Sequence, residues 1–158
     1  MNLSPLARRA AARVLVVLTL LAGVVVGSAA SPAAAVGCYG ATCTGKDPQA
    51  NGCAADAVTV EEFTYYYTRV ELRKSAACHA AWTRASNPAG TPPTSCNDMW
   101  VATRGYDAND VLKGSQIQQT VCGQGSTWTA MRSYFEWVRG CVIRVWYDQP
   151  PVACTARH

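Results

Sequence analysis

The chain has 158 residues, with 14 Lys or Arg and 10 Asp or Glu, so its formal net charge is +4 at pH 7. This length suits one domain after any leader is removed, and is too short for two ordinary ones. Basic residues alternate with acidic and apolar ones instead of clustering, which argues against a nucleic-acid-binding surface.

The first 35 residues have the organisation of a secretory signal peptide. Arg8, Arg9 and Arg13 form a positive start, Val14–Gly27 is apolar and uncharged, and Ala33–Ala35 supplies small residues for cleavage. The apolar run is shorter than the roughly 18 to 20 residues that span a bilayer, although an uncleaved anchor remains an alternative. We therefore expect residues 36–158 to be a single secreted domain without a stable membrane span.

The chain has eight cysteines, an even number, and all of them follow residue 37. An exported chain of this kind is expected to form disulfides, here up to four, but the spacing leaves about 105 pairings open. There is no C-x-x-C, and the adjacent Cys78 and His79 should point apart, so we expect neither a metal nor another cofactor. The expected disulfide cysteines are Cys38, Cys43, Cys53, Cys78, Cys96, Cys122, Cys141 and Cys154.

The first half of the mature chain predicts turns followed by strands. Residues 37–48 are dense in glycine and cysteine and predict a bridged loop. Residues 58–74 alternate apolar and polar side chains and predict two strands or one bent hairpin. Residues 76–84 suit either a helix or a central strand, with Trp82 in the core. Residues 87–95 contain three prolines and predict a surface loop.

The second half predicts further short strands at residues 99–103 and 117–122, separated by a turn at 105–110. Residues 127–138 and 141–147 predict two more strands, joined by a tight hairpin at Arg139-Gly140. Pro150-Pro151 should end the sheet, and Cys154 should fix the tail. Many short strands with frequent turns predict an all-β fold with room for one short helix, a small disulfide-stabilised sandwich or open barrel.

Three sequence strings carry a resemblance to a known family. They are CYGATCTGKDP at 38–48, GCAADAVTV at 52–60 and VELRKSAACHAAWTR at 70–84, and WTAM at 128–131 and VRGC at 138–141 extend them. The chain resembles a secreted domain of unknown function that is widespread in actinobacteria, over residues 37 to 145. The resemblance implies secretion, occurrence alone or as the outer part of membrane-tethered proteins, and no established catalytic residues.

The chain departs from that family at two kinds of position. Lys74 stands where the family often has an aromatic residue, and Cys96, Cys122 and Cys154 are additional. The resemblance thus divides the cysteines into a family-like group of five and an added group of three. Because both counts are odd, we expect at least one bridge to join the two groups.

Few residues of the mature chain suit acid–base catalysis. Its histidines are His79 and His158, no G-x-S-x-G presents a nucleophile, and nothing selects a pair of carboxylates. We therefore expect a non-catalytic binding module, either an extracellular protein adaptor or an envelope-binding protein. The alternatives are an adaptor subunit of a secreted actinobacterial toxin particle, a protease inhibitor that uses the proline-rich loop 88–96, and a small extracellular hydrolase.

The aromatic residues supply the predicted binding site. Tyr65, Tyr66 and Tyr67, if they lie in one strand, must point to both of its faces, so at least one ring should be exposed. Exposed rings stack on sugars or anchor protein partners. The predicted binding residues are Tyr65, Tyr66, Tyr67 and Trp100, and the predicted partner is an extracellular protein or a cell-envelope glycan.

Overall fold

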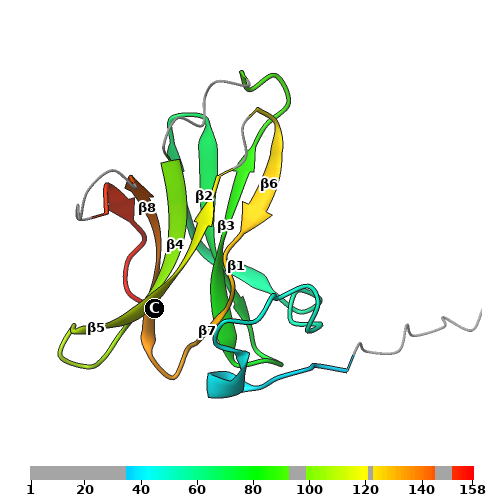
Figure 1. The fold of residues 1–158 in the computed structure, drawn as a ribbon, viewed down its shortest axis with the longest axis vertical. Coiled ribbons are helices and arrows are strands. Elements are labelled where there is room, and N and C mark those ends of the chain that lie inside the picture. The colour runs from blue at the N-terminus through cyan, green and yellow to red at the C-terminus, as the bar shows by residue number, and fades with distance from the viewer. Residues whose placement is uncertain (1–34, 93–98, 121–122, 145–150) are drawn as a thin grey trace, which may run out of the picture. The chain divides into compact units, whose positions relative to one another are not determined.

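The computed structural model describes residues 35–92, 99–120, 123–144 and 151–158, which form two antiparallel β-sheets (Figure 1). The predicted signal peptide lies outside the described residues, apart from Ala35. Within the described part of the chain, no helix is both long and apolar enough to cross a membrane. The only helical element described is the short 3-10 helix η1 (Gly40–Cys43).

The first sheet has the strand order β1-β2-β3-β6, and β7 also pairs with β3. Its strands are β1 (Val58–Tyr65), β2 (Thr68–Ser75), β3 (Ala80–Asn87), β6 (Gly125–Trp128) and β7 (Arg132–Ser133). The second sheet has the order β5-β4-β8-β9. Its strands are β4 (Met99–Tyr106), β5 (Leu112–Gln119), β8 (Trp137–Arg144) and β9 (Ala153–Cys154).

The two sheets pack face to face through small and branched apolar side chains. Val70 and Ala85 of the first sheet share one buried cluster with Val101 and Val142 of the second. Leu72 and Ala81 likewise contact Val138 of β8. The all-β prediction is therefore confirmed as an open sandwich of two antiparallel sheets.

A polar contact crosses the same interface, and we call it the threonine seam: Thr83, Thr103 and Thr129. All three are buried. The Thr103 hydroxyl lies 2.8 Å from that of Thr83 and 2.7 Å from that of Thr129, and the Thr83 hydroxyl donates to the Ala102 carbonyl. Each buried hydroxyl thus has a partner, which removes most of the cost of burying it.

A second buried cluster lies on the other side of the first sheet. There Ala80 and Trp82 are covered by three cysteines of the loop that precedes β1, by Cys78 of the β2–β3 turn and by Met131. The structure has disulfides between Cys38 and Cys43, Cys53 and Cys78, and Cys141 and Cys154. The last of these joins the family-like and added groups, so that prediction is confirmed. Cys96 and Cys122 lie outside the described residues.

Several predicted elements change in the structure. Residues 76–84 are not helical, because β3 begins at Ala80 and lies in the centre of the sheet. The strands predicted at 99–103 and 117–122 are longer, since β4 extends to Tyr106 and β5 begins at Leu112.

The predicted hairpin at Arg139-Gly140 is wrong. β8 runs straight through both residues, and the turn lies earlier, at residues 134–136. Gly140 is buried for a packing reason: a Cβ on it would lie 3.0 Å from the Thr83 hydroxyl. The single strand predicted over 127–138 is also broken, because the Met131 N–H donates to Lys46 in the N-terminal loop instead of to a neighbouring strand.

Candidate functional site

Four aromatic rings from three distant parts of the chain meet beside the disulfide-bonded loop. The His79 ring lies 4.0 Å from the Tyr134 ring and 4.3 Å from the Phe135 ring between centroids, and Tyr39 contacts both His79 and Phe135. Phe135 is 68% exposed and Tyr39 is 55% exposed. We call this surface, made of Tyr39, His79, Tyr134 and Phe135, the aromatic patch.

The two disulfides near the N-terminal end hold the segments that carry Tyr39 and His79. Tyr39 follows Cys38, and His79 follows Cys78 in the turn between β2 and β3. The Gly40 N–H donates to the Cys78 carbonyl over 2.7 Å, which ties the two segments together. The bridged loop thereby sets the position of Tyr39 relative to His79.

Local backbone geometry also favours the cluster. Gly40 has φ +52°, and a Cβ there would lie 2.5 Å from the Phe135 ring, so only glycine lets that ring approach. His79 itself has φ +51°, a left-handed conformation that costs a residue with a side chain about 1–2 kcal/mol. The surrounding contacts must hold His79 in this conformation, and such strain is often found at functional sites.

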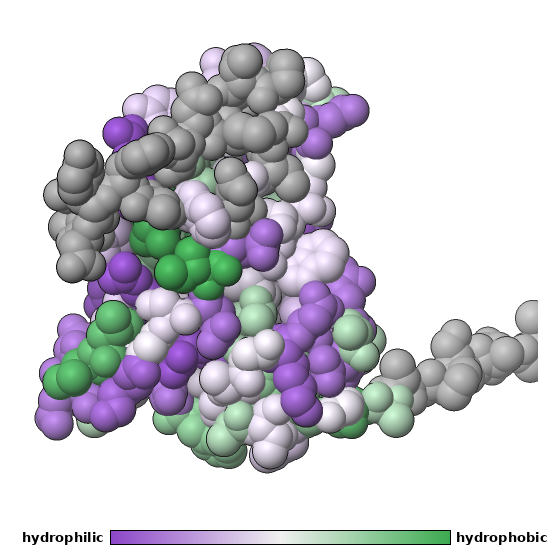
Figure 2. Space-filling view, in the orientation of Figure 1, coloured by the Kyte–Doolittle hydropathy of each residue, from purple (hydrophilic) through white to green (hydrophobic). Residues whose placement is uncertain are grey.

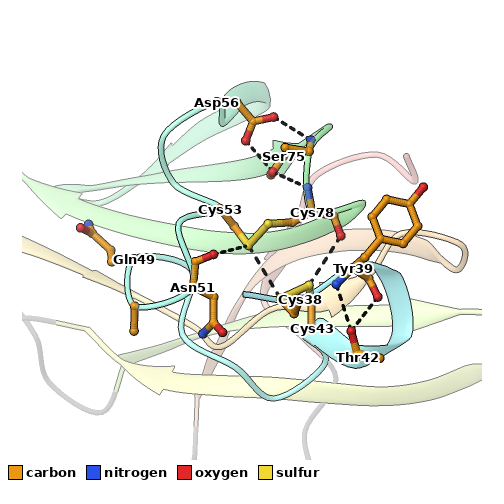
Figure 3. Close-up of a disulfide and its surroundings, with 12 residues drawn as sticks. Cys38, Tyr39, Thr42, Cys43, Gln49, Asn51, Cys53, Asp56, Ser75 and Cys78 are labelled. Carbon is orange, nitrogen blue, oxygen red and sulfur yellow. Dashed lines mark hydrogen bonds between the residues drawn. A yellow bond between two sulfur atoms is a disulfide. The ribbon is translucent and has the colours of Figure 1, made fainter. Parts of the chain in front are cut away.

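Asp56 fixes the turn that presents His79 (Figure 3). It accepts hydrogen bonds from the Ser75 hydroxyl at 2.6 Å and from the Ala77 N–H at 2.8 Å. Burial alone would raise the pKa of Asp56, but these hydrogen bonds outweigh it and lower the pKa below its usual value of 3.8. The ionised carboxylate therefore stabilises the β2–β3 turn.

A hollow of about 310 Å³ lies next to the aromatic patch, lined by Tyr134, Phe135, Trp137 and polar side chains. Lys74 places its ammonium 4.7 Å from the Tyr134 ring centroid, and burial lowers the pKa of this lysine. His158 lines the hollow and pairs with Glu61, with 2.6 Å between Nε2 and Oε2. The hollow thus combines aromatic rings with groups that donate hydrogen bonds, such as Lys74, and groups that accept them, such as Glu136.

The predicted binding residues are divided between different parts of the fold. Tyr65 ends β1, whereas Tyr66 and Tyr67 form the turn before β2, so the three do not lie in one strand. Tyr66 is 72% exposed and Tyr67 is 56% exposed, which confirms that part of the run is exposed. Tyr65 packs against the core, and Trp100 packs on Ala102, Cys141 and Ile143 of the other sheet. Their role in binding stays a prediction.

Sequence reasoning missed the aromatic patch because its members are separated by up to 96 positions in the chain, from Tyr39 to Phe135. The only signal in the sequence was the glycine after Tyr39, which is consistent with close approach of another group to the backbone there.

The β1–β2 turn that carries Tyr66 and the β2–β3 turn that carries His79 lie at opposite ends of β2. Eight residues of strand separate them by about 26 Å, so they are two distinct surfaces.

A smaller hollow of about 230 Å³ lies on the outer face of the first sheet, between Arg73, Arg84, Trp82 and Trp128. Two polar groups here are engaged within the fold: the Trp128 indole donates to Asp47 at 2.8 Å, and Arg73 Nη2 donates to the Ala57 carbonyl. Burial would raise the pKa of Asp47, but its hydrogen bonds to Ala50, Trp128 and Gln49 lower it. We therefore assign a structural role to these groups.

The face seen in Figure 2 has no broad apolar surface among its described residues. Hydrophobic colour is confined there to small separate areas, one of them at the tip of the β4–β5 hairpin, where Val111 and Leu112 are exposed.

A family model with the description "Protein of unknown function (DUF2690)" matches residues 41–137. The matched region contains His79, Tyr134 and Phe135, and begins two residues after Tyr39. The resemblance to a domain of unknown function is thereby confirmed. Neither the curated proteins nor the solved structures give a match.

Proposed function

The chain belongs to the DUF2690 family of proteins of unknown function, and on that premise we propose that it is an extracellular, non-catalytic binding domain. The aromatic patch and its adjoining hollow bind the partner, a saccharide unit of a cell-envelope glycan. The single observation that carries this proposal is the stack of Tyr39, His79 and Phe135, in which Tyr39 and Phe135 are exposed and disulfide cysteines directly precede Tyr39 and His79.

The exposure of these rings supports a binding role. Phe135 has no polar group that would favour contact with water, yet it stays 68% exposed beside a histidine in a strained conformation. Burying such a ring against a ligand removes apolar surface from water, with a gain of about 1.5–3 kcal/mol for a complete side chain.

The shape of the adjoining hollow favours a glycan over a protein partner. A volume of about 310 Å³ lies at the lower end of the range of small-molecule sites, about 300–1,000 Å³, and so suits one small ring-shaped unit. The exposed Trp137 ring can stack on the apolar face of a sugar, while Lys74 can bind its hydroxyl groups.

The histidines and disulfides support the other two parts of the proposal. His79 packs between rings, and its buried Nδ1 atom has no hydrogen-bond partner among the described residues. His158 is paired with Glu61 and not with a nucleophilic side chain. Three disulfides in the described part of the chain are typical of an oxidising compartment outside the cytoplasm.

Retention of the oxidised protein on insoluble glycans tests the proposal. Purified peptidoglycan, chitin and cellulose are each incubated with wild type and with Phe135→Ala and Tyr39→Ala. We expect retention on at least one glycan and a loss of affinity of about tenfold or more in both variants, as for a central aromatic anchor. Circular dichroism confirms that the variants remain folded.

Tyr66→Ala and Tyr67→Ala are matched controls, because they also remove exposed rings but lie at the other end of β2. These variants should bind like wild type. Loss of retention in these variants, with Phe135→Ala unaffected, would transfer the binding site to the tyrosine turn. Absence of retention on every glycan, together with specific cross-linking of one protein in culture fluid, would contradict the glycan assignment.

A further inference from the structure

The four cysteines on the outer side of the first sheet bring their sulfur atoms to one point (Figure 3). Cys38, Cys43, Cys53 and Cys78 are all buried, and their Sγ atoms lie within 4.8 Å of one another. We call this group the sulfur cluster. Its two bridges are in contact, since Cys38 Sγ and Cys53 Sγ are 3.8 Å apart although they belong to different disulfides.

This spacing matches the dimensions of a tetrahedral zinc site. Zinc binds four cysteine thiolates at about 2.3 Å, which places neighbouring sulfurs about 3.8 Å apart. The Cys38–Cys53 contact already has this length. The other contacts between the two bridges need to shorten by no more than about 1 Å, since none exceeds 4.8 Å. Each bonded pair must open to the same separation, which requires only its reduction and small side-chain rotations.

We propose that the sulfur cluster is a latent zinc site: reduction of both disulfides lets Cys38, Cys43, Cys53 and Cys78 bind one Zn²⁺ as a Cys₄ centre. Cys38 and Cys43 are five positions apart, a spacing found among structural zinc ligands. The other two ligands come from the loop before β1 and from the β2–β3 turn. Folding thus supplies what the sequence lacks, a second close pair.

A dithiol can reduce the two disulfides of the sulfur cluster. Two dithiol molecules transfer four electrons to the two protein disulfides, and each dithiol is oxidised to a disulfide. Four thiolates then coordinate Zn²⁺, and the four protons of the dithiols are released to solvent. Zinc binding should therefore weaken as the pH falls, because protons compete for the thiolates.

In the reduced protein, a bound zinc ion would form an alternative cross-link at the position of the two disulfides. One zinc would connect the same three segments that the two bridges connect, including those that carry Tyr39 and His79. Disulfide and zinc are then two mutually exclusive ways to hold this end of the fold. This inference is independent of the proposed function, since it concerns the loop and not the ligand.

Metal titration of the full chain tests whether the reduced sulfur cluster binds zinc. The protein is reduced with a phosphine under anaerobic conditions and titrated with Zn²⁺ against a chromophoric chelator, and with Co²⁺ to record its absorption. We expect one tightly bound zinc per reduced chain, a Co²⁺ spectrum typical of tetrahedral thiolate, and four sulfur neighbours at about 2.3 Å by X-ray absorption. The oxidised protein should bind no zinc.

Single substitutions identify the ligands. Cys43→Ser and Cys78→Ser should weaken zinc binding more than about 100-fold, because loss of an outer-shell partner alone costs about 10–100-fold. Cys154→Ser is the matched control, since that cysteine bonds to Cys141 in the other sheet, and it should bind zinc like wild type. No tight zinc binding by the reduced wild type, or an equal loss in Cys154→Ser, would overturn the proposal.

Discussion

Removal of single disulfides should destabilise the domain in the order of the loops that they close. The described bridges span 25 positions for Cys53–Cys78, 13 for Cys141–Cys154 and 5 for Cys38–Cys43. The entropy of loop closure gives about 3.5, 3 and 2 kcal/mol of stabilisation respectively. We therefore expect the double variant Cys53→Ala/Cys78→Ala to lose about 1.4 kcal/mol more than Cys38→Ala/Cys43→Ala, a tenfold difference in the folding equilibrium.

These two pairs allow a matched comparison because all four cysteines are buried in one cluster. Each double variant removes the same atoms from the same surroundings, so the cost of the vacated volume largely cancels between them. Urea denaturation followed by tryptophan fluorescence measures the difference, since Trp82 packs in that cluster. Equal losses in the two variants, or a reversed order, would show that native contacts and not loop length determine the stabilisation.

Three further changes test the core and the β2–β3 turn. Thr83→Val should cost about 0.5–1.5 kcal/mol for each hydrogen bond of the Thr83 hydroxyl that it removes, those to Thr103 and to the Ala102 carbonyl. Exposed Thr64→Val is the control in the same urea assay. Gly140→Ala should cost about 1–3 kcal/mol through its contact with the Thr83 hydroxyl, and calorimetry should show that the same change costs less in a Thr83→Ala background, where that hydroxyl is absent. Asp56 has a lowered pKa when folded, so its contribution to stability is present above its unfolded pKa of about 3.8 and is lost as the pH falls below it. Unfolding midpoints measured between about pH 6 and 3 should therefore depend less on pH in Asp56→Asn than in wild type, and identical slopes would contradict the assignment.

Local pattern was sufficient to predict β1 and β2 of the first sheet. The hairpin at residues 58–74 alternates apolar and polar side chains, so the burial of one face follows directly from the sequence. Gly140 shows the limit of the same reasoning. A glycine after a charged residue predicts a turn, but here it lies in the middle of β8 because a side chain on the opposite sheet occupies the space of its Cβ. Such a requirement depends on a partner far away in the chain.

The candidate site was less predictable than the fold for the same reason. Tyr65, Tyr66 and Tyr67 are conspicuous as neighbours in sequence, whereas Tyr39, His79 and Phe135 become neighbours only after two disulfides and the β7–β8 turn have formed. Pairing of eight cysteines cannot be deduced from their spacing. The contact between Tyr39 and His79 could therefore not be predicted from the sequence, because it depends on which cysteines are paired.

The threonine seam also restricts how β4 can align with its neighbours. Thr103 faces Thr83 and Thr129 in the native alignment, and the next residue along β4 is Arg104. A shift of one position would turn Thr103 away and direct a guanidinium group into the buried contact between the sheets, where it would find only hydroxyl partners. Misaligned strand pairings are thus penalised during assembly, which gives this small sandwich protection against the alternative pairings that lead β-proteins to aggregate.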